Sequence, residues 1–84
     1  MTLYPFSEQD VDKVKNTFTY RPPIDGQAEK YEELRELAKG IALRIMNLCP
    51  PSRERSLALT NLEQAIMWAN ASIARNETKE EENK

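Results

Sequence analysis

The chain has 84 residues and contains no histidine, one cysteine and only two glycines. Without histidine there is no general base of the kind that activates serine or cysteine nucleophiles, and the usual zinc sites are excluded as well. A single cysteine, Cys49, cannot form an intrachain disulfide. The two glycines, Gly26 and Gly40, are too far apart for a glycine-rich phosphate loop. We therefore expect neither catalysis nor a metal site, and no cofactor.

Long apolar runs and an excess of basic charge are also missing. No stretch approaches the roughly 20 apolar residues that span a bilayer, and the N-terminus does not resemble a signal peptide. Residues 1–76 include ten acidic and ten basic side chains, so this part of the chain has no net charge. A protein that binds a DNA or RNA duplex normally presents a basic face. The composition predicts a soluble, intracellular, single-domain protein (1–76) that binds neither membranes nor duplexes, followed by an acidic flexible tail (77–84).

The pattern of residues predicts an all-α fold that begins with a short helix at about 8–16. Ser7 and Asp10 have the spacing of a capping box, and Val11 and Val14 fall on one face. The segment FTYRPP (18–23) ends this helix, because consecutive prolines exclude helical geometry.

Two longer helices are predicted at 27–48, with Asp25 as its cap, and at 52–76, with Ser52 as its cap. In each, apolar residues recur at alternating spacings of three and four, which is typical of helices that pack along a heptad seam. The seam residues are Tyr31, Leu34, Ala38, Ile41, Ile45 and Leu48 in the first, and Leu59, Leu62, Ile66, Ala69 and Ile73 in the second. A tight proline-containing loop joins the two, which predicts an antiparallel helical hairpin.

The last helix has more apolar surface than a two-helix hairpin can cover. Met67 and Trp68 lie off the seam, and Leu57 lies on nearly the same outer face as Trp68. Trp68 packs either on Val11 and Val14 of its own chain or on a second subunit. Because one short and two long helices make a thin core, we expect an oligomer.

The segment FTYRPP and one arginine of the first long helix are the candidate recognition elements. An aromatic ring can stack on a base and a guanidinium can bind phosphate, so Tyr20 and Arg21 are suited to a nucleotide ligand. The alternative is that the aromatic residues anchor the linker to the hairpin, which we favour for Phe18. Arg35 stands in a row with Ala28 and Ala42, and it either contacts a ligand or forms a surface ion pair with Glu32.

Three blocks of the sequence, FTYRPP, EKYEELRELAKGIALRI and LCPPSRERSLALTNLEQAIMWANASIARNE, resemble the phage-encoded helical-hairpin sponges that include the anti-CBASS and Thoeris anti-defence proteins. The resemblance covers about residues 18–77. It implies a non-enzymatic homo-oligomer, a hexamer, that holds a cyclic oligonucleotide or a cyclic ADP-ribose-type signal between protomers. Such a protein would act in the cytoplasm of the infected bacterial host.

The resemblance also implies roles for particular residues. Tyr20 matches the tyrosine that stacks on a base, and Arg35 matches the basic residue that contacts the phosphates, where relatives can have lysine. Arg75 is the candidate for a second pocket that takes cyclic trinucleotides. The implied function is sequestration of cyclic dinucleotides such as 3′,3′-cyclic GMP-AMP. The alternatives are sequestration of a cyclic ADP-ribose-type signal, and a helical adaptor that binds a protein partner.

Overall fold

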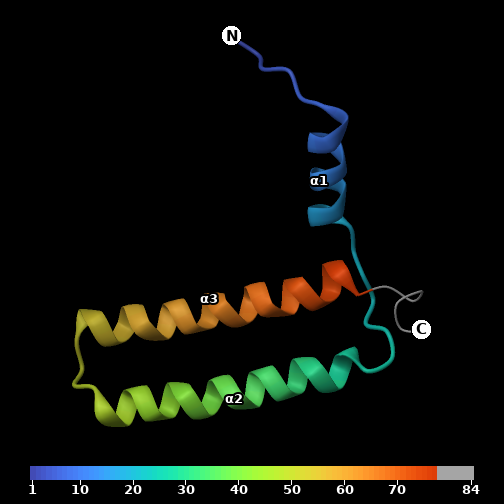
Figure 1. Cartoon of the computed structure of the whole chain (residues 1–84). Coiled ribbons are helices and arrows are strands. Elements are labelled where there is room, and N and C mark those ends of the chain that lie inside the picture. Colours follow the sequence, from blue (N-terminus) through green and yellow to red (C-terminus); the bar gives the residue numbers. More distant parts are fainter. Residues whose placement is uncertain (78–84) are drawn as a thin grey trace.

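The computed structural model describes residues 1–77 and contains three helices within that range, α1 (Glu8–Phe18), α2 (Gln27–Leu48) and α3 (Arg53–Asn76). Helices α2 and α3 lie antiparallel and form a hairpin, while α1 stands away from it at the end where the hairpin is open (Figure 1). The predicted all-α hairpin is confirmed. Apart from Glu77, the predicted acidic tail lies outside the described residues.

Helix α1 begins at the predicted capping box. The Ser7 hydroxyl accepts a hydrogen bond from the Asp10 backbone N–H (3.1 Å), and the Asp10 carboxylate accepts one from the Ser7 backbone N–H (2.9 Å). The helix continues to Phe18, two residues beyond the predicted end. A proline restricts mainly the residue directly before it, so Pro22 leaves Thr17 and Phe18 free to remain helical.

Helix α2 begins differently from the prediction, because Gly26 and not Asp25 occupies the cap position. Gly26 has φ +88°, in the left-handed region that glycine adopts with little strain, and it offers no side chain to cap the helix. The backbone N–H of Gln27 donates to the Ile24 carbonyl (3.0 Å), which closes a turn ahead of the helix. The turn geometry therefore determines this helix start.

The loop between α2 and α3 is held by two local interactions. Ser52 caps α3 as predicted, its hydroxyl accepting from the Arg55 backbone N–H (3.1 Å). Arg55 in turn donates from Nη1 to the carbonyls of Met46 (3.1 Å) and Cys49 (3.3 Å). The last turn of α2 has no basic residue of its own, so Arg55 supplies the positive charge that favours a helix C-terminus.

The seam between the long helices follows the prediction in α3 and departs from it in α2. All five predicted seam residues of α3 are half-buried. In α2, however, Ile41 is 51% exposed and Leu48 is exposed, while Ala42 is half-buried and lines the groove facing α3. The buried and half-buried residues of α2 are Gln27, Tyr31, Leu34, Ala38, Ala42 and Ile45. Their spacings of 4, 3, 4, 4 and 3 match the 3.6-residue turn of a straight helix, whereas the heptad prediction assumed 3.5.

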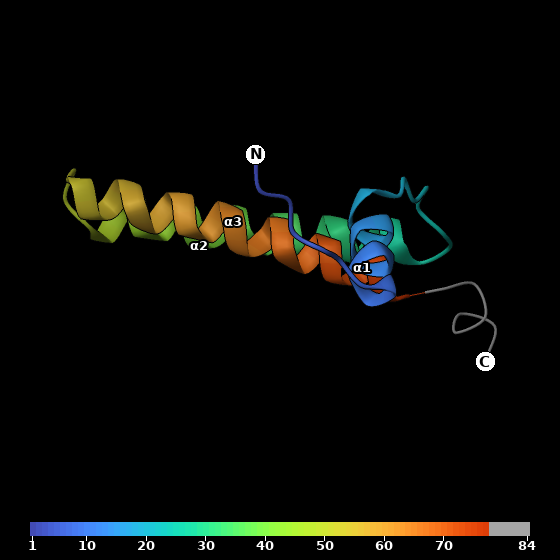
Figure 2. The ribbon, with the colours of Figure 1, turned by 90° about the horizontal axis from the view of Figure 1, so that it is seen from above.

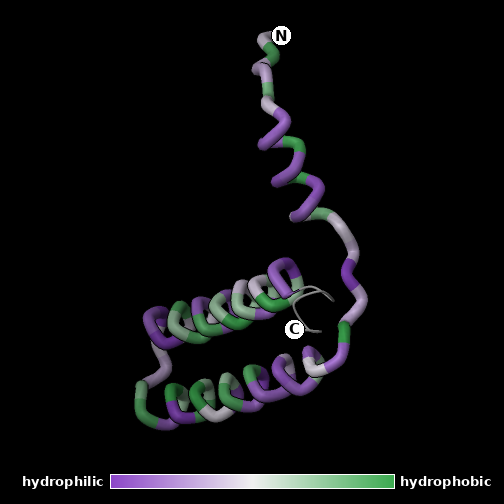
Figure 3. Tube along the Cα trace, turned by 45° about the vertical axis from the view of Figure 1, so that its right-hand side comes forward, coloured by the Kyte–Doolittle hydropathy of each residue, from purple (hydrophilic) through white to green (hydrophobic). Residues whose placement is uncertain are grey.

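No hydrophobic side chain among residues 1–77 is fully buried. The molecule measures 48 × 47 × 16 Å, and the hairpin is only one helix thick when seen from above (Figure 2). Apolar residues occur along both long helices and also in the segment before α1 (Figure 3). None of the described helices is both long and apolar enough to cross a membrane.

The predicted anchoring of Phe18 is not observed, and neither is the packing of Trp68 on α1, which was one of its two alternatives. Phe18, which we expected to anchor the linker, is 81% exposed. Trp68 is 67% exposed, so α1 does not cover it in the single chain. The linker of residues 19–26 directs α1 away from the hairpin (Figure 1), and both aromatic side chains are exposed in the single chain.

Candidate functional site

Three shallow depressions follow one another along the hairpin. The first lies between the linker and the C-terminal end of α3, the second lies between the N-terminal half of α2 and α3, and the third lies near the middle of the hairpin. The first and second share Ala74, and the second and third share Arg35. The second is lined by Tyr31, Arg35, Asn70, Ala71 and Ala74. Each depression thus shares a lining residue with the next, and we call the three together the hairpin groove.

Tyr20 and Arg21 lie at the linker end of the hairpin groove. Tyr20 is 84% exposed, so its ring is available for stacking. Arg21 is half-buried: Nη2 donates to the side-chain oxygen of Asn16, and Nη1 is enclosed without a hydrogen-bond partner among residues 1–77. The structure thus places both residues of the predicted recognition segment in one depression.

Gln27 fixes the position of this linker end. It is the only fully buried residue of the described chain, at 3% exposure. Its side-chain oxygen accepts from the Ile24 backbone N–H (3.1 Å), and its Nε2 donates to the Ile73 carbonyl (3.4 Å) and to the Glu77 carboxylate (3.3 Å). One side chain therefore joins the linker, the start of α2 and the end of α3.

Glu77 extends this connection to a second residue of α2. Its carboxylate forms an ion pair with Lys30. The hydrogen bond from Lys30, and next that from Gln27, lowers the pKa of Glu77 below its ordinary value of 4.5. The hydrogen bond to Glu77 likewise raises the pKa of Lys30 above 10.5. Although Glu77 was predicted as part of the tail, it caps the C-terminus of α3 and holds the hairpin closed at the linker end.

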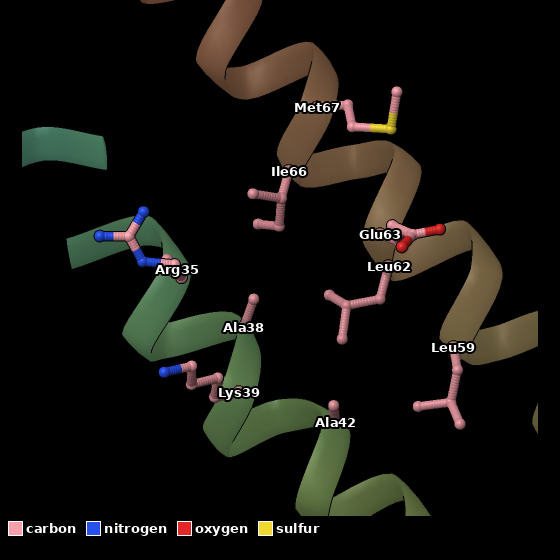
Figure 4. Close-up of a pocket in the computed structure, with 9 residues that line it drawn as sticks. All are labelled: Arg35, Ala38, Lys39, Ala42, Leu59, Leu62, Glu63, Ile66 and Met67. Carbon is pink, nitrogen blue, oxygen red and sulfur yellow. The ribbon is translucent and has the colours of Figure 1, made fainter. Parts of the chain in front are cut away.

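Arg35 lies at the junction of the second and third depressions. Its guanidinium makes no ion pair or hydrogen bond within residues 1–77, so the alternative of a surface ion pair with Glu32 is not observed. In Figure 4 the guanidinium extends away from the apolar floor between the helices, into which Ile66 and Leu62 project from α3. Lys39, one turn further along α2, pairs with Glu36 (3.2 Å). Arg35 is thus an exposed cation beside an apolar groove.

Two groove residues, Gln27 and Asn70, were missed by the sequence predictions. The side-chain oxygen of Asn70 is enclosed and has no hydrogen-bond partner among residues 1–77. A signal for Gln27 was present, since it lies four residues before Tyr31 on the seam face. A buried polar side chain is nearly always hydrogen-bonded, so its place on the seam could have marked Gln27. Asn70 lies beside the seam residue Ala69 and gave no such signal.

Arg75 is not brought together with the other candidates. It is half-buried in the last turn of α3 and does not line any of the three depressions. Tyr20, Arg21 and Arg35 thus lie along one groove, and Arg75 lies outside it.

The described residues contain a stacking ring, unpaired guanidinium nitrogens and an apolar floor, and no cluster of three or more side chains suited to a metal ion. These features define an all-helical hairpin protein with a shallow, partly apolar groove between its two long helices. Residues 10–74 match the family model described as Acb2/Tad1, hairpin domain. The chain belongs to this family of anti-CBASS and anti-Thoeris proteins, which are sequestering sponges and not enzymes. No curated protein and no solved structure gives a significant match.

The family match covers a different range from the resemblance in the sequence blocks, which spans about residues 18–77. The family match begins at Asp10, inside α1, whereas the resemblance begins at Phe18. The family match ends at Ala74. Most of α1 and the whole linker therefore belong to the family domain, together with almost all of the hairpin.

Proposed function

We propose that this protein is a phage sponge that sequesters cyclic dinucleotide immune messengers, such as 3′,3′-cyclic GMP-AMP, and so inhibits CBASS-type defence in the cytoplasm of the infected bacterium. The observation that carries the proposal is that Tyr20 and Arg35 line adjoining depressions that share Ala74. A base stacks on Tyr20, and the following phosphate reaches the guanidinium of Arg35. The family match supports sequestration over turnover.

The charges of the groove suit a small doubly charged ligand better than a polymer. Residues 1–76 are neutral overall, and the cations near the ligand are Arg35 and, beside Tyr20, Arg21. A guanidinium binds phosphate in a bidentate manner, and a few local cations suffice for two phosphates. Arg75, outside the groove, is the residue that we assign to a second pocket for cyclic trinucleotides.

The proposed site needs more than one protomer. Competition with an immune effector requires binding near nanomolar, about −12 kcal/mol, whereas stacking on one aromatic ring contributes about 1–3 kcal/mol. A site at a two-fold axis contains two copies of Tyr20 and Arg35 and matches the pseudo-symmetry of a cyclic dinucleotide. We propose that protomers assemble through the apolar side chains that the single chain leaves exposed, with a hexamer as the final state.

The direct test is recovery of the ligand. Purified protein is mixed with 3′,3′-cyclic GMP-AMP, the unbound fraction is removed by filtration, and the protein is then denatured by heat. A sponge depletes the filtrate and releases the cyclic ligand unchanged on denaturation. Linear or hydrolysed product would contradict the proposal and indicate a phosphodiesterase, and a filtrate at the starting concentration would show that this messenger is not bound.

Two other functions can be separated from this one with a panel of ligands. A cyclic ADP-ribose-type signal has the same base and phosphate groups and would use the same groove. An adaptor that binds a protein partner is favoured by the exposed surface of Leu57, Met67 and Trp68. A ligand that binds the native state raises the unfolding temperature. Stabilisation by a cyclic dinucleotide supports the sponge, stabilisation by cyclic ADP-ribose alone supports the first alternative, and stabilisation by no nucleotide supports the adaptor.

A further inference from the structure

We propose that Asn70 recognises the ribose 2′-hydroxyl of the bound nucleotide, so that the groove distinguishes ribonucleotide from deoxyribonucleotide ligands. The proposal rests on the proposed function, because it takes Tyr20 as the base contact and Arg35 as the phosphate contact. What it adds is a residue for the third part of a nucleotide, the sugar.

The order of residues along the hairpin groove carries the argument. Tyr20 lines the first depression, Arg35 lines the second, and Ala74 lies in both. In a nucleotide the ribose always lies between the base and the phosphate. A ligand that spans from Tyr20 to Arg35 therefore places its ribose over Ala71 and Ala74, whose methyl side chains allow a close approach.

Asn70 is the polar residue that α3 contributes to this part of the groove. It lines the second depression with Arg35, and its side-chain oxygen is enclosed without a partner among residues 1–77. Buried polar atoms nearly always have a hydrogen-bond partner, so an unpaired one indicates a partner that is not part of the single chain. The enclosed oxygen is out of reach of solvent in the single chain, so the carboxamide pairs with a ligand hydroxyl in the depression through a rotation about χ2.

The chemistry of the two groups matches. A carboxamide has both a donor and an acceptor, and a half turn about χ2 exchanges their positions. A hydroxyl also both donates and accepts, so it can pair with the amide in either orientation. In a 3′,3′-linked cyclic dinucleotide the 2′-hydroxyl is the one that remains free, and it is the group that distinguishes RNA from DNA.

The test is a thermodynamic cycle in which Asn70 of the protein and the 2′-hydroxyl of the ligand are changed separately and together. Affinities of the full chain and of Asn70→Leu and Asn70→Ala are measured for 3′,3′-cyclic GMP-AMP and for its 2′-deoxy analogue. We expect the deoxy analogue to bind the unchanged chain about tenfold more weakly, on the scale of one lost hydrogen bond, and both ligands to bind the variants equally. Asn61→Leu, an exposed asparagine of the same helix, is the matched control and should keep the tenfold difference.

The outcomes separate this inference from the proposed function. If the unchanged chain binds neither ligand, the proposed function fails. If it binds both ligands equally, or if the Asn70 variants keep the tenfold difference, the function stands and the role of Asn70 is refuted. A change in oligomeric state of both Asn70 variants, measured by light scattering, without loss of the discrimination would show that the enclosed oxygen pairs with another subunit instead.

Discussion

The side-chain nitrogen of Gln27 donates to the backbone carbonyl of Ile73, 46 residues away in the chain, and so joins the first turn of α2 to the last full turn of α3. This contact lies beside the depression of Tyr20 and Arg21, to which Gln27 itself contributes. The open end of the hairpin and the linker that presents Tyr20 are therefore held by the same buried side chain.

Replacing Gln27 by alanine should destabilise the protein by about 1–3 kcal/mol, because it leaves the Ile24 N–H without its acceptor and removes two interhelical hydrogen bonds. Urea unfolding at a fixed protein concentration measures the change. Gln64→Ala, at an exposed position of α3, is the control and should change stability by less than about 0.5 kcal/mol. Equal effects of the two substitutions would contradict the assigned role of Gln27.

The contacts of Glu77 predict a pH dependence. Its pKa is lowered from 4.5 in the folded state, so its contribution to stability is present above pH 4.5 and is lost as the pH falls through the lower folded value. The pKa of Lys30 is raised from 10.5, so its contribution is present below pH 10.5 and is lost as the pH rises through the higher folded value. Glu77→Gln should thus be less stable than the unchanged chain at neutral pH, and the difference should shrink on acidification. Thermal unfolding as a function of pH tests this, with the exposed Glu33→Gln as a variant whose difference should stay constant.

Tyr20→Ala and Arg35→Ala should each weaken ligand binding at least tenfold, about 1.4 kcal/mol for one lost contact. Tyr20→Phe should retain most of the affinity, since the stacking face is kept, whereas Arg35→Lys should bind with intermediate affinity because it loses bidentate geometry. Isothermal titration calorimetry measures these values. Tyr4→Ala and Arg44→Ala, which remove the same residue types from exposed positions outside the groove, should bind like the unchanged chain. Unaltered affinity in both Tyr20→Ala and Arg35→Ala would refute the site.

Trp68→Glu should reduce the size of the assembly, because it places a charge on the largest exposed aromatic side chain of α3. Sedimentation velocity measures the distribution of species. Asn47→Glu adds the same charge to an exposed position of α2 and should leave the distribution unchanged. An assembly of full size in Trp68→Glu would mean that this face of α3 is not an interface between protomers.

Arg55→Met should destabilise the hairpin by about 1 kcal/mol, since its guanidinium bonds to two carbonyls at the end of α2. Arg53→Met, two residues earlier and exposed, removes the same charge without those bonds and serves as the control in the same urea titration. If both variants lose equal stability, the effect is one of overall charge and not of capping.

The elements that sequence analysis predicted well are those specified by neighbouring residues. The caps at Ser7 and Ser52 follow from local hydrogen bonding, and both were predicted correctly. The seam of α3 also follows from the local spacing of apolar side chains. For α2 the prediction assumed 3.5 residues per turn, which places Ile41 on the face toward α3. A straight helix has 3.6 residues per turn, and because the difference accumulates along the helix, Ala42 faces α3 instead.

The parts of the site that escaped prediction depend on contacts between distant residues. Gln27 donates hydrogen bonds to Ile73 and Glu77, and no residue near Gln27 in the sequence indicates those partners. Asn70 acquires its place beside Arg35 only when the hairpin closes. The placement of Tyr20 and Arg21 in one depression was expected because they are adjacent in sequence. That this depression and the one lined by Arg35 share Ala74 depends on the folded hairpin.

No hydrophobic side chain among residues 1–77 is fully buried, so in the proposed assembly the folded state depends on protein concentration. Protomers that assemble as proposed gain apolar burial from association, so the melting temperature should rise with total concentration by mass action. The number of ligand-binding sites would then rise more steeply than the total concentration of protein. Early in synthesis few sites would exist, and beyond the concentration at which protomers assemble each further chain would add binding capacity directly.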